Sequence, residues 1–124
     1  MKKYTLDLSS YEVTIQTHER NKETDAIEIV TKQEVYPIRE NYATWLRMSG
    51  IWKDGIELCD AHDLAKQVKN YKEDSFEIDE TELELLKKAL NKLITIDSTK
   101  GMQALGGEIH EEAIARVFKA PEIK

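Results

Sequence analysis

The segment TKQEVYPIRENYATWLRMSG, residues 31–50, changes its hydrophobic period at Pro37. A strand-like pattern of apolar and polar residues begins at Ala26 and extends toward Tyr36. After the proline, four apolar residues follow helical spacing until Ser49-Gly50 ends the pattern: Ile38, Tyr42, Trp45 and Leu46. Proline suits the start of a helix because a backbone N–H in the first turn would have no partner inside the helix. The segment predicts β-structure before Pro37 and helices after it.

Two further stretches before Pro37 alternate between apolar and polar residues. The first contains Leu6 and Leu8, and the second contains Val13 and Ile15, with Ser9-Ser10 as the turn between them. Residues 18–25 read HERNKETD and predict a polar loop before the third strand. Three antiparallel strands in a meander are the simplest arrangement of these elements.

Three to four helices are expected after Pro37, the first of them in the segment just described. Residues 51–58 contain Asp54-Gly55 and predict a small β-ribbon or an irregular link. Asp60 then suits the N-cap of a helix that ends near Tyr71. Asp79 and Glu82 form a capping-box pattern at the start of the next helix, with Ile78 placed to contact Leu83. A helical turn is predicted around residues 102–105 and a last helix over residues 108–118.

These patterns predict a single α+β domain over residues 1–124. Residues 1–36 should be mainly β, residues 37–118 mainly α, and residues 119–124 a frayed tail. We expect the N-terminal antiparallel β-meander of about three strands to pack on the three to four C-terminal helices.

Composition narrows the functional classes. The chain carries 18 basic and 24 acidic residues, a net charge of −6, so a nucleic-acid partner is unfavourable. Its single cysteine, Cys59, excludes an internal disulfide. No apolar run follows Lys2-Lys3, and no stretch approaches the roughly 18 apolar residues of a membrane span. A cytoplasmic location without membrane contact is the expectation.

The residues that could support catalysis or metal binding are few. Cys59 and His62 could share a metal ion, or Cys59 could form a thiol dyad with His62 or His110. A second ligand pair is missing from the sequence, and Cys59 beside Leu58 is also typical of a small core residue. We therefore assign no catalytic residue, metal or cofactor, and expect a protein that is not an enzyme.

An aromatic and basic segment offers candidate partner-binding residues. Tryptophan, tyrosine and arginine frequently anchor protein interfaces, and they can also stack on single-stranded bases. The alternative is that the aromatic residues belong to the core on the buried side of the first helix. The candidates are Arg39, Tyr42, Trp45, Arg47 and Trp52.

A second candidate surface is acidic. Residues 73–84 contain seven acidic residues and no basic one. Glu80 and Glu82 gain from the dipole of the helix that begins there. Glu73, Asp74 and Glu77 precede that helix, so they are expected to steer a basic partner surface if one exists. The alternatives are a mimic of nucleic-acid phosphates and an ordinary solvated loop before a well-capped helix.

The order of elements resembles that of small orphan proteins encoded by tailed bacteriophages and prophages. The resemblance rests on an N-terminal strand pair, the Pro-Ile-Arg-Glu-Asn junction at residues 37–41, and the helical region at residues 78–118. It covers most of the chain and carries over no catalytic residue. Such proteins are typically assembly factors, inhibitors directed at the host or its defences, or proteins of unknown role, and the resemblance implies no more than that.

The leading hypothesis is a non-enzymatic protein-binding module that docks on another protein or on itself. The alternative is a small enzyme or metal-dependent protein that uses Cys59, His62 and His110. A nucleic-acid binder is the third hypothesis.

Overall fold

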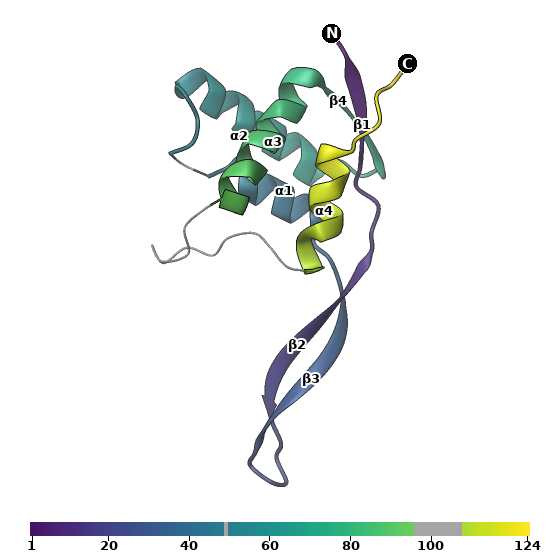
Figure 1. Cartoon of the computed structure of the whole chain (residues 1–124), viewed down its shortest axis with the longest axis vertical. Coiled ribbons are helices and arrows are strands. Elements are labelled where there is room, and N and C mark those ends of the chain that lie inside the picture. The colour runs from purple at the N-terminus through teal and green to yellow at the C-terminus, as the bar shows by residue number, and fades with distance from the viewer. Residues whose placement is uncertain (49, 96–107) are drawn as a thin grey trace.

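The computed structural model describes residues 1–48, 50–95 and 108–124. Within that part of the chain, four helices gather into one body, and a long two-stranded ribbon projects from it (Figure 1). Two separate antiparallel strand pairs are present among the described residues. The α+β class predicted from the sequence is confirmed, but the predicted meander is wrong.

The first strand pair joins the N-terminus to the middle of the chain. Strand β1 (Lys3–Asp7) pairs with β4 (Ser75–Asp79), from Lys3 opposite Asp79 to Asp7 opposite Ser75. The predicted separation at Pro37 is therefore incomplete, because a strand lies between two helices. The alternating pattern that marks β4 is only five residues long. Phe76 and Ile78 are buried, and the residues on either side of Phe76 are exposed.

The C-terminal tail lies along the other side of β1. The backbone N–H of Thr5 donates to the carbonyl of Pro121 at 2.9 Å, and that of Ile123 donates to Lys3 at 2.8 Å. Tyr4 forms a bridge with Glu122. The prediction of a frayed tail over residues 119–124 is wrong, because backbone groups of β1 bond this segment.

The second strand pair is the projecting ribbon. It consists of β2 (Glu12–Arg20) and β3 (Ile27–Val35), which pair along their whole length. The loop between them is shorter than the polar sequence of residues 18–25 suggests, because residues 18–20 belong to β2. β1 does not join this pair. Leu6 and Leu8 are fully buried and draw the N-terminal strand into the body instead.

The first two helices are α1 (Ile38–Leu46) and α2 (Gly55–Asn70). α1 follows Pro37 as predicted. α2 begins earlier than predicted, because the Asp54 carboxylate accepts a hydrogen bond from the Glu57 N–H at 2.9 Å and caps the helix. The β-ribbon considered for residues 51–58 is wrong, whereas the alternative of an irregular link holds for residues 51–54. The predicted cap at Asp60 is wrong. An aspartate–glycine pair suits a helix start as well as a hairpin turn.

The remaining helices are α3 (Glu80–Thr95) and α4 (Glu108–Phe118). The capping box of α3 is confirmed: Glu82 N–H donates to the Asp79 carboxylate at 2.8 Å, and Asp79 N–H donates to the Glu82 carboxylate at 3.2 Å. The last helix has the predicted bounds. The helical turn predicted around residues 102–105 lies outside the described residues.

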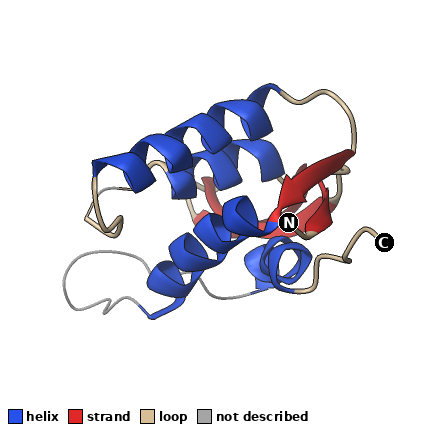
Figure 2. Ribbon diagram, turned by 90° about the horizontal axis from the view of Figure 1, so that it is seen from above, coloured by secondary structure: helices blue, strands red, loops and turns tan. Residues whose placement is uncertain are grey.

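All four helices and the β1–β4 pair contribute to one hydrophobic core inside the body (Figure 2). Its largest fully buried side chains come from widely separated segments: Leu6, Leu8, Tyr42, Leu46, Leu64, Val68, Ile78, Leu86, Leu90 and Val117. No side chain of residues 12–35 is fully buried, although Val13 packs against the edge of the core. Almost the whole ribbon therefore lies outside the region that stabilises the fold.

Candidate protein-binding surface on the β2–β3 ribbon

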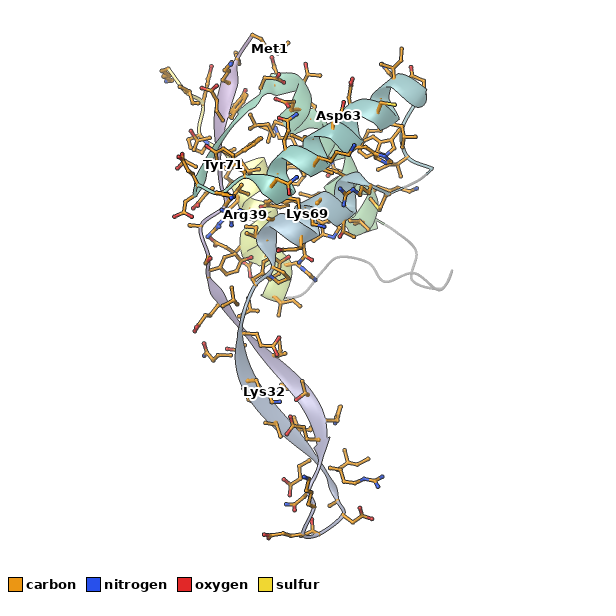
Figure 3. All side chains as sticks on the ribbon, turned by 180° about the vertical axis from the view of Figure 1, so that it is seen from behind. Met1, Lys32, Arg39, Asp63, Lys69 and Tyr71 are labelled. Carbon is orange, nitrogen blue, oxygen red and sulfur yellow. The ribbon has the colours of Figure 1, made fainter. Side chains whose placement is uncertain are left out.

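The ribbon extends away from the helices with solvent on both of its faces. Its register runs from Glu12 opposite Val35 to Arg20 opposite Ile27. In Figure 3, Lys32 marks the middle of the ribbon, far below the helical body. Nine residues per strand correspond to a length of roughly 30 Å. A two-stranded hairpin without a third strand or a covering layer is only marginally stable in water.

A tight turn closes the far end of the ribbon. Asn21 N–H donates to the Ala26 carbonyl at 2.8 Å, and the Asn21 side chain accepts from the Glu23 N–H at 2.8 Å. Asp25 has a positive φ of 57°, a conformation that aspartate tolerates better than most residues. The turn is therefore locally bonded, which holds the two strands in register.

Backbone hydrogen bonds alternate along the ribbon, and among the described residues no strand pairs with the outer edge of β2. Tyr36 N–H donates to Tyr11 at 2.9 Å at the base, and Asn21 bonds Ala26 at the tip. Bonded and non-bonded pairs alternate in an antiparallel ladder, so the odd-numbered residues of β2 bond β3. The even-numbered residues direct their N–H and C=O groups outward: Glu12, Thr14, Gln16, His18 and Arg20.

One face of the ribbon carries large exposed aliphatic side chains. Ile27 is 68% exposed, Ile29 is 64% exposed and Val35 is 62% exposed. The register places these residues opposite the even-numbered residues of β2, so all three lie on the same face. The other face has half-buried residues along its centre: Val13, Ile15, Thr17 and Val30. Exposed aliphatic residues on an uncovered ribbon are typical of a contact surface.

Aromatic residues attach the ribbon to the body. Tyr11 and Tyr36 stack with their ring centroids 5.0 Å apart, and the Tyr36 hydroxyl lies 2.6 Å from His110 Nδ1 on α4. The Arg116 guanidinium lies 4.6 Å from the centre of the Tyr11 ring and donates to the Ser9 carbonyl at 2.7 Å. These contacts hold the base of the ribbon in a defined direction.

Burial sets the ionisation of these residues. It raises the pKa of the Tyr11 and Tyr36 hydroxyls and lowers the pKa of the His110 imidazole below its ordinary value of 6.5. All three side chains are therefore uncharged near neutral pH. The hydrogen bond between the Tyr36 hydroxyl and His110 Nδ1 therefore joins two neutral groups.

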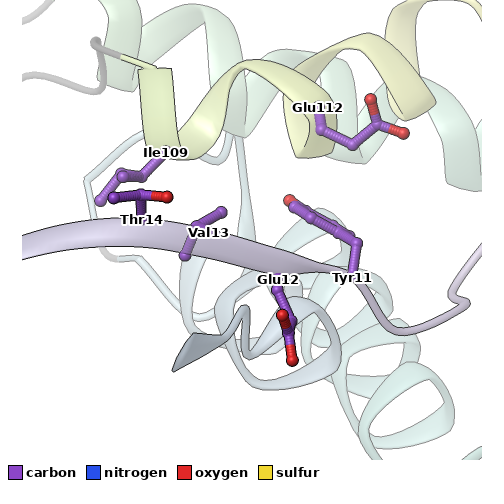
Figure 4. Close-up of a pocket in the computed structure, with 6 residues that line it drawn as sticks. All are labelled: Tyr11, Glu12, Val13, Thr14, Ile109 and Glu112. Carbon is purple, nitrogen blue, oxygen red and sulfur yellow. The ribbon is translucent and has the colours of Figure 1, made fainter. Parts of the chain in front are cut away.

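A pocket of about 380 Å³ opens beside the base of β2 (Figure 4). Four consecutive residues of β2 and its approach line one side, and Ile109 and Glu112 of α4 line the other. Consecutive side chains of a strand point to opposite faces. A pocket lined by four residues in a row therefore lies along the edge of the strand rather than over one face. Those four residues are Tyr11, Glu12, Val13 and Thr14.

Charge distinguishes the partners that this surface suits. Residues 12–35 contain six acidic and three basic residues. Lys32 forms an ion pair with Glu19, and Arg20 lies 3.5 Å from Asp25, so two of the basic residues already face carboxylates. A surface with this excess of negative charge attracts the basic side chains of a protein rather than the phosphates of a nucleic acid.

The structure places the aromatic candidates partly in the core. Tyr42 is fully buried, and its hydroxyl donates to the Ala113 carbonyl at 2.6 Å. Trp45 is 7% exposed and lies edge-on to Tyr42 and His110. These two side chains therefore belong to the core, as the alternative interpretation of this segment expected. A partner has no access to them in this conformation.

The remaining residues of that segment are separated. Arg39 donates to three backbone carbonyls inside the chain, whereas Arg47 is exposed at the end of α1. Trp52 is half-buried; its indole N–H donates to the Met48 carbonyl at 2.7 Å, and the Lys88 ammonium lies 5.7 Å from its ring. The five candidates do not form one continuous surface.

The acidic candidates lie on the body, at the β1–β4 pair. Glu73, Asp74 and Glu77 are all exposed. Glu77 forms an ion pair with Lys3 at 3.2 Å, and the Asp74 carboxylate lies 3.9 Å from Arg39. Neighbouring cations of the same chain therefore partly offset this acidic segment. Whether it also steers a partner stays a prediction.

The residues of the enzyme and metal alternative do not come together. Cys59 is exposed on α2 and is not the small core residue that its neighbours suggested. His62 lies one turn further along the same helix, whereas His110 bonds Tyr36 at the base of the ribbon. Within the described residues, no group of three or more His, Cys, Asp or Glu side chains is arranged to hold a metal ion.

The sequence patterns did not single out the ribbon as a candidate surface. A signal was present in β3: Val30 shares its face with Glu28, Lys32 and Glu34 at a spacing of two residues, while other aliphatic residues, such as Ile29, point to the opposite face. A strand that packs on helices needs one consistently apolar face. The absence of such a face could have indicated a projecting ribbon.

Comparison with known proteins finds no matching family model, and no curated protein or solved structure matches the chain. Among the described residues, no helix combines the length and the apolar character that crossing a membrane requires.

Proposed function

We propose that this chain is a protein-binding module that contacts its partner through the β2–β3 ribbon. The observation that carries the proposal is a long ribbon with an open strand edge and three exposed aliphatic side chains on one face. Backbone groups on an open edge readily pair with a strand of another protein.

Energetic considerations support the same function. The ribbon adds little to the core, yet ordering about 24 residues costs conformational entropy of roughly 1–2 kcal/mol per residue. Burial of Ile27, Ile29 and Val35 against a partner would offset part of that cost. A ribbon of this length is thus better explained by contacts with another protein than by stabilisation of its own fold.

The proposal moves the contact surface away from the aromatic segment around Trp45. Two roles implied by the resemblance of layout, an assembly factor and an inhibitor directed at the host, both require protein contacts. The ribbon supplies a surface for either role. Arg47, Trp52 and the acidic residues Glu73, Asp74 and Glu77 remain exposed or half-exposed and could extend it over the body.

The test removes the ribbon and keeps the body. Replacing residues 14–33 with Asn-Gly joins Val13 to Glu34, a pair whose backbones bond each other in the ladder, by a two-residue hairpin turn. The tagged variant and the unchanged chain are each used to capture proteins from cells of the native host. We expect the captured partner, including any second copy of the chain, to be lost from the variant.

Circular dichroism provides the control for folding. The shortened variant should keep the helical signal and the melting temperature of the body, because none of the removed side chains is buried in the core. Capture of the same partners in the same amounts by a folded variant would refute the ribbon as the contact element.

A further inference from the structure

We infer that the partner bound by the ribbon is a second copy of this chain, paired edge to edge through β2. This inference rests on the proposed function, since it names the occupant of the open β2 edge of the same ribbon. Two β2 strands would run antiparallel and join two ribbons into one four-stranded sheet. The two bodies would then lie at opposite ends of that sheet.

The outward backbone groups of β2 permit this pairing. Glu12, Gln16 and Arg20 all direct their N–H and C=O groups to the open edge, as the alternation of the ladder requires. A twofold axis at Gln16 pairs each outward residue of one copy with an outward residue of the other. The whole strand therefore pairs, and its outward donors and acceptors find partners.

The side chains are self-complementary in that register. Glu12 of one copy lies opposite the partner's Arg20, and Arg20 lies opposite the partner's Glu12. A twofold interface uses the same patch twice, so one favourable charge pair is repeated at both ends. Arg20 is 69% exposed in its contact with Asp25 and can reach another carboxylate without leaving a buried position.

Near its centre, the joined sheet brings Ile15 and Thr17 of both copies together on one face, with Lys32 beside each Ile15. Ile15 lies opposite the partner's Thr17 in this register, and Thr17 lies opposite the partner's Ile15. Val30 flanks Thr17 on the neighbouring strand of each copy. Half-buried side chains of two ribbons would thus become contiguous, which is the arrangement that favours cross-strand contacts.

The pocket beside β2 lies where the end of the second ribbon would approach. It lies along the strand edge from Tyr11 to Thr14, where the tip of the partner's ribbon arrives (Figure 4). Its rim holds two carboxylates, Glu12 on β2 and Glu112 on α4. The partner's Arg20 and Lys22 would bring positive charge to that acidic rim.

The open edge of β3 is less suitable in the equivalent arrangement. A twofold axis at Thr31 also pairs that strand over its whole length. It places Glu28 opposite the partner's Glu34 at both ends, and like charges in directly opposite positions are destabilising. We therefore assign the interface to the β2 edge.

Charge exchange tests the register directly. The dissociation constant of the dimer is measured by sedimentation for the unchanged chain, Glu12→Arg, Arg20→Glu and the double variant. Each single change creates two like-charge pairs, so we expect about tenfold weaker association or more. The double variant restores both opposite-charge pairs and should recover most of the lost affinity. Recovery by a second change in the same chain is expected only when the partner is another copy.

Proline provides a matched pair of edge variants. Gln16 and Thr31 lie opposite each other in the ribbon and direct their N–H groups to opposite edges. Gln16→Pro removes a donor from the β2 edge and should abolish dimers. Thr31→Pro removes a donor from the β3 edge and should leave them intact. Neither change removes a hydrogen bond inside the ribbon.

A chain that stays monomeric at every concentration would overturn the inference, as would a double variant no tighter than the single ones. Dimers abolished by Thr31→Pro but not by Gln16→Pro would overturn it as well. The proposed function fails by a different result, namely unchanged capture of partners by the variant lacking residues 14–33. A monomeric chain whose partner is lost with the ribbon would therefore refute the second copy and keep the ribbon as a binding surface.

Discussion

Arg39 shows how one side chain can join segments that are far apart in the sequence. Its guanidinium donates to the carbonyls of Tyr71 at 2.8 Å and Glu73 at 2.8 Å, and to that of Leu8 at 3.2 Å. The rigid fork of arginine can serve three acceptors, which a lysine ammonium in the same place cannot match in geometry. The sequence indicated a partner-binding arginine, and the structure gives this residue a role inside the fold.

The first prediction concerns Arg39. Arg39→Lys should lower the free energy of unfolding by about 1–3 kcal/mol, because charged hydrogen bonds to carbonyls are lost. Arg47→Lys is the matched control on the same segment, and its exposed side chain should make the change worth within about 0.5 kcal/mol. Urea denaturation of both variants measures the difference. Equal stabilities would mean that the Arg39 contacts contribute little to the fold.

At the scale of elements, helix starts show how a local motif can be ambiguous. Asp54-Gly55 and Asp60 both fit an N-cap pattern, and Asp54-Gly55 also fits a hairpin turn. The structure selects Asp54, and α2 then presents Ala61, Leu64 and Val68 to the core. Starting the helix at Gly55 adds more than one turn and puts Cys59 on an exposed position.

The second prediction compares the two candidate caps of α2. Asp54→Ala removes the acceptor of the Glu57 N–H and should cost about 1 kcal/mol of stability. Asp60→Ala changes an exposed residue inside the helix and should cost less than about 0.5 kcal/mol. Thermal or chemical unfolding of the two variants tests the assignment. A larger loss for Asp60→Ala would contradict the early start of α2.

At the scale of the whole molecule, the length of a segment does not reflect its contribution to stability. The short C-terminal segment bonds β1 on the side opposite β4, whereas the much longer ribbon contributes no fully buried side chain. A few terminal residues should therefore matter more to the melting temperature than the twenty residues of the outer ribbon.

The third prediction follows from that contrast. Deleting residues 121–124 removes the bonds of Thr5 to Pro121 and of Ile123 to Lys3, and should lower stability by about 1–2 kcal/mol. Replacing residues 14–33 with Asn-Gly should leave the melting temperature of the body nearly unchanged. Calorimetry of both variants at a concentration where the chain is monomeric makes the comparison. A large loss on shortening the ribbon would show that it stabilises the body.

Interactions between neighbouring residues were sufficient to predict several elements of the fold. The sequence by itself determined the α+β class, the start of α1 after Pro37, the capping box of Asp79 and Glu82, and the bounds of α4. Each of these depends on residues within one or two turns of one another, so neighbouring side chains decide the outcome. The core alternative for Tyr42 and Trp45 also came from their spacing.

Tertiary structure alone decided which strands pair and which surface is left open. A period of two shows that a segment is a strand, but backbone hydrogen bonds are nearly the same for every partner. β1 pairs with β4, more than sixty residues away, because Leu6 and Ile78 are buried together in the core. β2 and β3 are thereby left to each other. The ribbon, its open edge and the pocket beside Tyr11 result from that choice, which depends on competition among distant segments for burial.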